Sequence, residues 1–261
     1  MKYMGSKNRI ADDIIETILN EYVKRLKSSR SDLIVYSRDS DTFVDVFCGG
    51  CSVIEKVPNT YKRIANDKQK YLIAMWRRLT KGYSIGLPTT ISRELYSDVR
   101  DSYNKGDDRY RDDVKGWVGF MASFNGRFFD GGYSGHNVVG KNGKARDYIK
   151  ENITNTLNQI QNLSDVQWYD LDYEELTKHI PENSILYCDP PYKGTTQYSI
   201  SKDFDYERFY NWCRKMSKKG HFVFVSEYEM PEDFKCIWSK QITNAMHQTN
   251  TKKPVEKLFT L

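Results

Sequence analysis

A short apolar segment that ends in Asp189-Pro190-Pro191-Tyr192 places the strongest local constraint on how this chain folds. Residues 185–188 read Ile-Leu-Tyr-Cys and predict a strand. Two successive prolines have fixed φ angles and no backbone N–H, so the segment after this strand can neither extend a sheet nor begin a helix. We expect a stiff loop that presents a carboxylate, a proline carbonyl and an aromatic ring where open α/β sheets bind ligands. The alternative is an ordinary turn with a surface aspartate.

A glycine turn follows a second predicted strand, at residues 42–47. The turn is Cys48-Gly49-Gly50, and residues 61–67 predict a further strand that ends in Asp67. The interval from Asp45 to Asp67 is 67 − 45 = 22 residues, close to the roughly 20 at which an acid accepts the ribose hydroxyls of a bound nucleoside. This spacing indicates an adenosine-containing cofactor, although an ordinary pair of parallel strands with acids at their ends has the same pattern.

Hydrophobic periodicity over the rest of the chain indicates an α/β fold. Helices are expected at residues 9–27, 52–55, 71–79, 155–163, 173–179 and 206–216. Further strands are expected at 166–169 and 221–226, and residues 237–240 and 257–261 suit a closing antiparallel hairpin. The strand at 221–226 is almost wholly apolar, which is typical of a parallel sheet covered on both faces.

Between residues 81 and 152 this periodicity fades into short polar and aromatic pieces with many glycines. We therefore expect a subdomain at 81–152, inserted into a main domain made of 1–80 and 153–261. Part of the insert mixes aromatic and basic side chains, which suits stacking on bases and neutralising phosphates. The basic members are Arg127, His136, Lys141, Lys144 and Arg146. The alternative is a glycine-rich surface loop.

Composition permits a nucleic-acid partner without requiring one, because 40 Lys and Arg stand against 35 Asp and Glu. No apolar run approaches the roughly 20 residues needed to cross a bilayer, and the basic N-terminal stretch lacks the apolar core of a signal peptide, so we expect a cytoplasmic protein. Cys48 and Cys51 form a C-x-x-C pair that suits thiol redox chemistry or half a zinc site. No second pair of cysteines or histidines lies at ligand spacing.

Six segments together resemble the Dam-type DNA adenine methyltransferases, in the α-group of the D12 class. They are KYMGSK (2–7), FVDVFCGG (43–50), IAND (64–67), SFNGRFF (123–129), YDLDY (169–173) and YCDPPY (187–192). The resemblance implies a Rossmann-like methyltransferase fold, with a mostly parallel seven-stranded sheet. It implies that 1–80 and 153–261 form the catalytic domain, and that 81–152 is a mainly helical target-recognition subdomain with a hairpin.

The implied reaction transfers a methyl group from S-adenosylmethionine to the N-6 amine of an adenine flipped out of duplex DNA, leaving S-adenosylhomocysteine and needing no metal. Asp189 and the Pro190 carbonyl would accept from the amine, Pro191 would stiffen the loop and Tyr192 would stack on the base. The residues implied to bind the cofactor are Tyr3, Lys7, Asp45, Phe47, Gly49, Asp67, Asp172, Tyr173 and Asp189. Among them, Lys7 would face the methionine carboxylate, Asp67 the ribose hydroxyls, and Asp172 with Tyr173 the adenine.

For DNA, the resemblance implies a recognition hairpin that carries Asn125 and Arg127, with the site GATC as an expectation. Arginine pairs with guanine edges and asparagine with adenine edges in the major groove. The residues expected to contact DNA are Phe124, Asn125, Arg127, Phe128, Tyr133, Lys141, Lys144 and Arg146. Phe124, Phe128 and Tyr133 are candidates to fill the gap left by the base. A bacterial or phage origin and a cognate restriction nuclease would fit the family, as would an enzyme without such a partner.

One departure from the family pattern leaves alternatives open. Cys51 stands where the family usually has the last glycine of F-x-G-x-G, and its side chain could crowd the cofactor or point into the first helix. The alternatives are transfer to the N-4 amine of cytosine, a thiol oxidoreductase that uses Cys48 and Cys51, and a DNA-binding protein that has lost catalysis.

Overall fold

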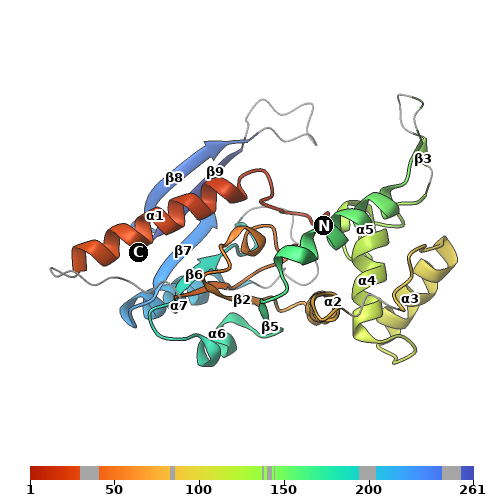
Figure 1. The fold of residues 1–261 in the computed structure, drawn as a ribbon, viewed down its shortest axis with the longest axis horizontal. Coiled ribbons are helices and arrows are strands. Elements are labelled where there is room, and N and C mark those ends of the chain that lie inside the picture. The colour runs from red at the N-terminus through yellow and green to blue at the C-terminus, as the bar shows by residue number, and fades with distance from the viewer. Residues whose placement is uncertain are drawn as a thin grey trace.

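A seven-stranded sheet in the order β5-β2-β1-β6-β7-β9-β8 forms the centre of the protein. The computed structural model describes residues 1–29, 41–82, 86–136, 138–139, 143, 145–193, 204–242 and 254–261 (Figure 1). The strands are β1 (Thr42–Asp45), β2 (Lys62–Asn66), β5 (Gln167–Tyr169), β6 (Ile185–Cys188), β7 (Phe222–Glu227), β8 (Lys235–Gln241) and β9 (Val255–Thr260). The strands from β5 to β7 in this order are parallel, whereas β9 is antiparallel to β7 and β8. The predicted mostly parallel seven-stranded sheet and its closing hairpin are therefore confirmed.

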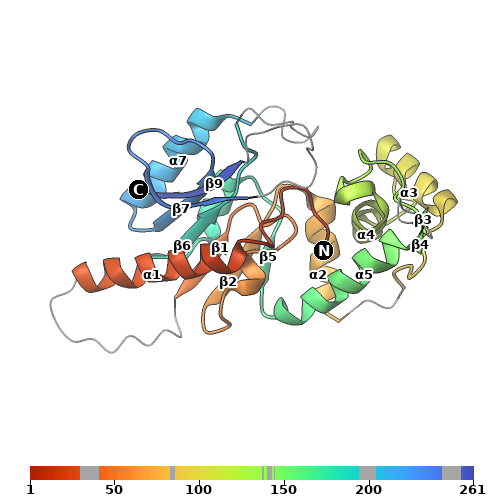
Figure 2. The same ribbon diagram turned by 90° about the horizontal axis from the view of Figure 1, so that it is seen from above.

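Both faces of the sheet are covered, because successive side chains of a strand point to opposite faces. On β6, Ile185 and Tyr187 join one hydrophobic cluster, whereas Leu186 and Cys188 join the other. The first cluster includes α1 (Ala11–Ser29) and α2 (Lys70–Thr80), and the second includes α6 (Tyr173–Leu176) and α7 (Tyr206–Lys218). Accordingly, α1 and α7 lie on opposite sides of the sheet (Figure 2).

Two predicted helices differ from the structure in a way that local sequence explains. The helix expected at 52–55 is a short 3-10 turn, Ile54–Lys56. The helix expected at 155–163 is α5 (Tyr148–Gln159), followed by a 3-10 turn at Ile160–Asn162. Helix α5 begins earlier because the Asp147 carboxylate accepts a hydrogen bond from the Lys150 amide at 2.8 Å and so caps its first turn.

A second group of elements lies beyond α2, at the opposite end of the molecule from α7 (Figure 2). It contains α3 (Arg93–Lys105), α4 (Asp112–Ala122), a 3-10 turn η3 (Phe124–Gly126), and the antiparallel strands β3 (Val138–Val139) and β4 (Ala145–Arg146). Helix α4 crosses α2 closely, because a Cβ atom on Gly116 would lie 2.0 Å from the Tyr71 carbonyl oxygen. The predicted boundaries of the insert, 81 and 152, stay a prediction.

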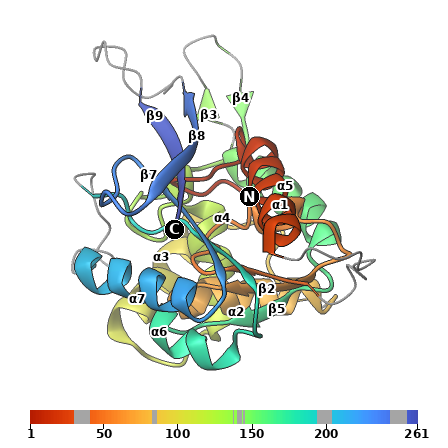
Figure 3. The ribbon, with the colours of Figure 1, turned by 90° about the vertical axis from the view of Figure 1, so that its left-hand side faces the viewer.

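The arrangement of these parts leaves the chain start between the sheet and the α4–α5 group (Figure 2). The β3–β4 and β8–β9 pairs extend toward the same side of the molecule (Figure 3). None of the described helices is long and apolar enough to cross a membrane. A functional site is expected at the carboxyl ends of the central strands, close to residues 2–7.

Candidate active site

Three acids gather where neighbouring parallel strands end. Asp45 ends β1 and is the register partner of Tyr187 on β6, while Asp67 follows β2 and Asp189 follows β6. Burial, followed by the charges of Asp189 and Asp67, raises the pKa of Asp45 well above its usual value. The three carboxyl groups therefore lie close enough to influence one another, as expected for strand ends at one edge of a parallel sheet.

Lys7 supplies a buried positive charge at this edge. Its Nζ atom lies 3.0 Å from Oδ1 of Asp189 and 3.8 Å from Oε2 of Glu256. The backbone amide of Lys7 donates to the Ser52 hydroxyl at 3.1 Å, which fixes the segment before α1. Burial lowers the pKa of Lys7, but the two carboxylates outweigh it and leave that pKa above its usual value. Lys7 therefore carries its charge at neutral pH.

Asp189 itself is held between opposing influences. Burial raises its pKa, the charge of Lys7 lowers it and the charge of Glu256 raises it again, which leaves the pKa at about 6. Its side chain keeps 18% of its surface exposed, although the Oδ1 atom that faces Lys7 is buried. At neutral pH Asp189 is thus mostly ionised and can accept a hydrogen bond.

The loop after Asp189 is attached to β7 and β9, which pair with each other in antiparallel orientation. The Tyr192 hydroxyl donates to Oε2 of Glu256 at 2.6 Å, and the Lys193 amide donates to Oε2 of Glu227 at 3.1 Å. The Tyr192 ring meets the Tyr228 ring edge-on, with centroids 4.7 Å apart. Burial raises the pKa of Glu227 to about 7. The loop is therefore anchored by β9 and by the end of β7.

The glycine turn is tied to the end of β2, as its predicted role requires. The Gly49 amide donates to Oδ2 of Asp67 at 3.0 Å, and the Gln69 amide donates to Oδ1 at 2.9 Å. On the other side, the carbonyl of Gly49 accepts from the indole of Trp76 at 3.3 Å. The carbonyl of Gly50 accepts from Nε2 of Gln159 at 2.8 Å. Asp67 therefore holds the turn in place through the hydrogen bond that it accepts from Gly49.

Tyr3 explains why residues 49 and 50 are glycines. A Cβ atom on Gly49 would lie 2.6 Å from Cε1 of Tyr3, and one on Gly50 would lie 2.6 Å from its Cβ. Gly49 also has a φ angle of +44°, which side chains rarely adopt. The Tyr3 ring thus lies directly on the turn, with Phe120 on its other side at a centroid distance of 5.9 Å.

Cys51 has a backbone conformation that favours glycine. Its φ angle is 59°, and its side chain is fully buried in the first hydrophobic cluster, with Sγ 3.7 Å from the Gly49 carbonyl oxygen. Of the two orientations open from the sequence, the side chain therefore takes the inward one. Burial raises the pKa of both Cys48 and Cys51, which disfavours the thiolate that redox chemistry needs.

An aromatic cluster packs around Phe47, the residue just before the glycine turn. Phe47 is half-buried and packs on Tyr173 and Phe209, with centroid distances of 5.9 and 5.7 Å. Tyr173 is only 5% exposed, so most of its ring contacts the core. Asp172 caps α6 through the Glu174 amide at 3.1 Å. Phe47 is therefore more accessible than Tyr173, the other ring of this cluster that is predicted to meet a cofactor.

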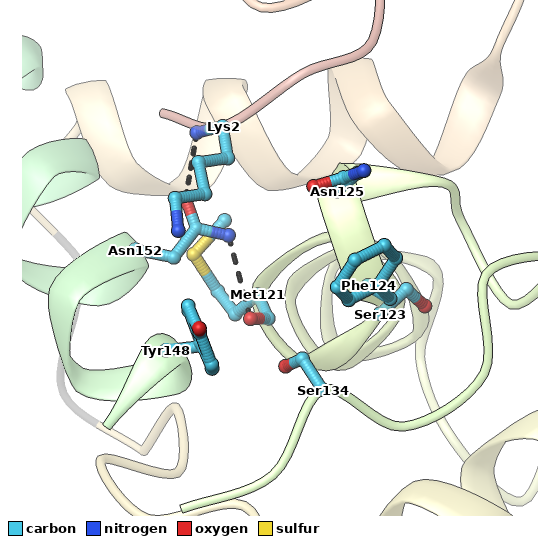
Figure 4. A pocket seen from close by; sticks show the side chains of 8 residues that line it. All are labelled: Lys2, Met121, Ser123, Phe124, Asn125, Ser134, Tyr148 and Asn152. Carbon is cyan, nitrogen blue, oxygen red and sulfur yellow. Dashed lines mark hydrogen bonds between the residues drawn. The ribbon is translucent and has the colours of Figure 1, made fainter. Parts of the chain in front are cut away.

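A small hollow lies between the chain start and the end of α4 (Figure 4). Phe124 and Asn125 stand on one side of it, Tyr148 and Asn152 on the other, and Lys2 lies above. The Lys2 amide donates to Oδ1 of Asn152 at 2.7 Å. Phe124 exposes 50% of its surface. The residues lining the hollow are Lys2, Met121, Ser123, Phe124, Asn125, Ser134, Tyr148 and Asn152.

The other residues predicted to contact DNA are spread between core and surface. Phe128 is 8% exposed and stacks on Tyr71 at 5.6 Å, and the Tyr133 hydroxyl donates to the Ile91 carbonyl at 2.7 Å. Arg127 is half-buried, and Arg146 is exposed and pairs with Glu151 at 2.7 Å. Lys141 and Lys144 lie outside the described residues. Phe124 is thus the only one of the three gap-filling candidates that exposes much of its ring.

Three buried polar residues at the site were missed by the sequence analysis. Glu227 and Glu256 face the loop from β7 and β9, but each is the single acid of its strand and gives no local signal. Asn66 donates to the Val46 and Leu171 carbonyls, each at 3.0 Å, and accepts from the Leu171 amide at 3.0 Å. Asn66 lies in the segment IAND (64–67), where the strand pattern indicated a role only for Asp67 at its end.

The site can be compared with metal centres and with known protein families. Among the described residues, no cluster of three His, Cys, Asp or Glu side chains suits a metal ion. A family model described as D12 class N6 adenine-specific DNA methyltransferase matches residues 3–253. The match spans Lys7, Asp67 and Asp189, and it ends before Glu256.

Proposed function

This chain belongs to the D12 class of N6 adenine-specific DNA methyltransferases, and we propose that it takes the methyl group from S-adenosylmethionine and reacts with an adenine extruded from the duplex. Methylation of adenine N-6 in DNA is the activity of its family. The observation that carries the proposal is the buried ion pair of Lys7 and Asp189, which lies beside the glycine turn at the carboxyl edge of the sheet.

The residues around the turn fit a nucleoside with a charged amino-acid tail. Oδ1 of Asp45 is buried and has no hydrogen-bond partner among the described residues, which suits an ammonium group such as that of methionine. Phe47 offers a partly exposed ring, and Asp67 lies where an acid accepts ribose hydroxyls. Lys7 would face the methionine carboxylate as well as Asp189. When bound, the cofactor supplies an electrophilic methyl group on a sulfonium.

The loop would orient the amine that receives this methyl group. The lone pair of the adenine amine is delocalised into the ring, so two acceptors are needed to draw the N–H₂ group toward tetrahedral geometry. Asp189 and the Pro190 carbonyl would supply these two acceptors, and the proline would keep its carbonyl fixed before reaction. Asp189 would hold the amine through its N–H group and would take up the proton that the nitrogen loses once it carries the methyl group.

Extrusion of the adenine would take place beside the hollow near Phe124. An enzyme that acts on a base inside a duplex must take it out of the stack, which costs a few kcal/mol. Phe124 is an exposed ring next to Asn125 and Lys2, and it could fill part of the space that the base leaves. Tyr192 would stack on the extruded base. GATC is the first recognition sequence to test, on the family resemblance alone.

Labelled S-adenosylmethionine and mixed duplex DNA provide the direct test. We expect the label to be recovered in N6-methyladenine after digestion, and sequencing of methylated positions would give the recognition site. Asp189→Ala should abolish transfer and leave cofactor binding largely intact, whereas Asp233→Ala, at an exposed surface ion pair, should change neither. Label in cytosine, or retention of more than a small fraction of turnover by Asp189→Ala, would contradict the proposal.

A further inference from the structure

Glu256 connects two of the residues around Asp189, although it comes from a strand at the far end of the sequence. Its Oε2 atom accepts from the Tyr192 hydroxyl at 2.6 Å and lies 3.8 Å from Nζ of Lys7. The Glu256 side chain is 8% exposed, so both contacts are made away from bulk water. A carboxylate in such a place is stable only with partners of this kind, and removal of one partner would leave it only partly compensated.

The contact with Tyr192 fixes more than a hydroxyl group. The ring lies edge-on against Tyr228, with centroids 4.7 Å apart, and the ammonium of Lys7 lies 4.5 Å from its centroid. The hydrogen bond to Glu256 fixes the far end of the same ring, so its plane is held from three sides. A ring that must stack on a base gains from this, because its orientation is set before the base arrives.

The contact with Lys7 divides one positive charge between two carboxylates. Lys7 is nearer to Asp189, at 3.0 Å, than to Glu256, at 3.8 Å. Among the described residues, the ionisable groups that interact with Asp189 are Lys7 before α1, Asp45 on β1, Tyr187 and Cys188 on β6, Tyr192 in the loop, Glu227 and Tyr228 at the end of β7, and Glu256 on β9. Glu256 is the negative charge in this set that also contacts the ammonium of Lys7.

We propose that Glu256 is a positioning residue for methyl transfer, which fixes the Tyr192 ring through its hydroxyl and shares the charge of Lys7 with Asp189. The inference rests on the proposed function, because Tyr192 and Asp189 are the groups that would meet the adenine. It extends the site to β9, beyond the residues that the family model matches. Glu256 touches no reacting atom and acts through its two neighbours.

A double-mutant cycle tests the connection to Tyr192. Single-turnover methylation of duplex DNA is measured for Tyr192→Phe, Glu256→Leu and the double variant, with melting temperature and cofactor binding as checks on folding. We expect each single change to slow transfer about tenfold. The double change should slow it by about the same factor, because each single change already removes the same hydrogen bond between Tyr192 and Glu256. Effects that multiply to about a hundredfold would overturn the inference, as would a wild-type rate for Glu256→Leu.

A charge-neutral variant tests the connection to Lys7, and it also serves if Glu256→Leu fails to fold. Glu256→Gln keeps an acceptor for Tyr192 but removes the charge that competes for Lys7. We expect the acid limb of its pH–rate profile to move to lower pH, with the rate at pH 8 near that of wild type. Glu229→Gln, at an exposed position just after β7, should leave the profile unchanged. An unmoved limb in Glu256→Gln would overturn this part of the inference.

These outcomes can be told apart from failure of the proposed function. If the wild-type protein does not methylate adenine, the proposed function is wrong, and the cycle has no activity to compare. If the wild-type protein is active but the cycle is multiplicative and the acid limb does not move, only the role of Glu256 is wrong.

Discussion

The ammonium of Lys7 lies 3.0 Å from the carboxylate of Asp189, and both side chains are largely buried. A buried acid without a cation would have its pKa raised by desolvation alone. The charge of Lys7 works against that burial and leaves the pKa of Asp189 at about 6. The acceptor for the adenine amine is thus ionised at neutral pH because a lysine from the start of the chain reaches it.

The pH dependence of transfer should reveal this pair. Asp189 must be ionised to accept from the amine, so single-turnover rates should be full above about pH 7 and fall as the pH drops through about 6. Lys7→Met removes the charge that lowers the pKa of Asp189, so its acid limb should move to higher pH, opposite to the shift expected for Glu256→Gln. Lys7→Arg, which keeps the charge, should move it less. A limb at the same pH in wild type and Lys7→Met would contradict this role.

Gly49 should tolerate no side chain, for a reason separate from backbone strain. An alanine there would place its Cβ atom 2.6 Å from the Tyr3 ring, so the ring must leave the turn. We expect Gly49→Ala to weaken binding of S-adenosylmethionine at least about tenfold in calorimetry, because the cradle changes shape. Gly82→Ala is the matched control, since Gly82 also has a positive φ angle, +77°, but no atom lies within 4 Å of its added Cβ. Equal affinity in both variants would count against the packing of Tyr3 on the turn.

Phe124 and Phe128, four residues apart, should respond differently to truncation. Phe124 is 50% exposed, so Phe124→Ala should reduce extrusion of the target base, measured by the fluorescence of 2-aminopurine at that position, and leave the melting temperature near wild type. Phe128 is 8% exposed and packs on Phe120 with centroids 4.8 Å apart. Phe128→Ala should instead lower the free energy of unfolding by about 3 to 5 kcal/mol. The opposite pattern would show that the wedge has been assigned to the wrong ring.

The sequence predicted the parts of the site that depend on local pattern. The apolar run at 185–188 forms β6 with the same bounds, and the two prolines end it as their geometry requires. The glycine turn also follows β1 and Asp67 follows β2, as the predicted strands indicated. Each of these signals lies within a few residues of the feature that it predicts, which is why periodicity and turn chemistry are enough to find them.

Contacts between distant segments could not be predicted in this way. Glu256 reaches Lys7 and Tyr192 because β9 inserts between β7 and β8, and the sequence does not state that order. Helices α3 and α4 were expected only through the family resemblance. Helix α4 is buried almost all round and therefore lacks a clear apolar stripe. Lys7 was expected to face the cofactor, and its pairing with Asp189 depends on the same tertiary arrangement.

Cys51 gives a last prediction, which concerns the position where the family pattern is broken. Its positive φ angle of 59° costs about 1–2 kcal/mol for a residue with a side chain, and Cys51→Gly would remove that strain. The same change removes a buried thiol and gives the unfolded chain more conformational freedom. These two losses together offset the stability that the relief of strain would add. We therefore expect the free energy of unfolding to change by less than about 1 kcal/mol in urea titrations.

Cofactor affinity in Cys51→Gly should stay within about twofold of wild type, because the thiol points into the core and not toward the outer face of the turn. Cys48→Ala with Cys51→Ala should likewise keep methyl transfer, since burial raises the pKa of both thiols and neither is needed as a thiolate. A large gain in affinity on restoring the glycine would mean that the cysteine does crowd the cofactor. Loss of transfer in a folded double variant would instead mean that Cys48 and Cys51 take part in the reaction.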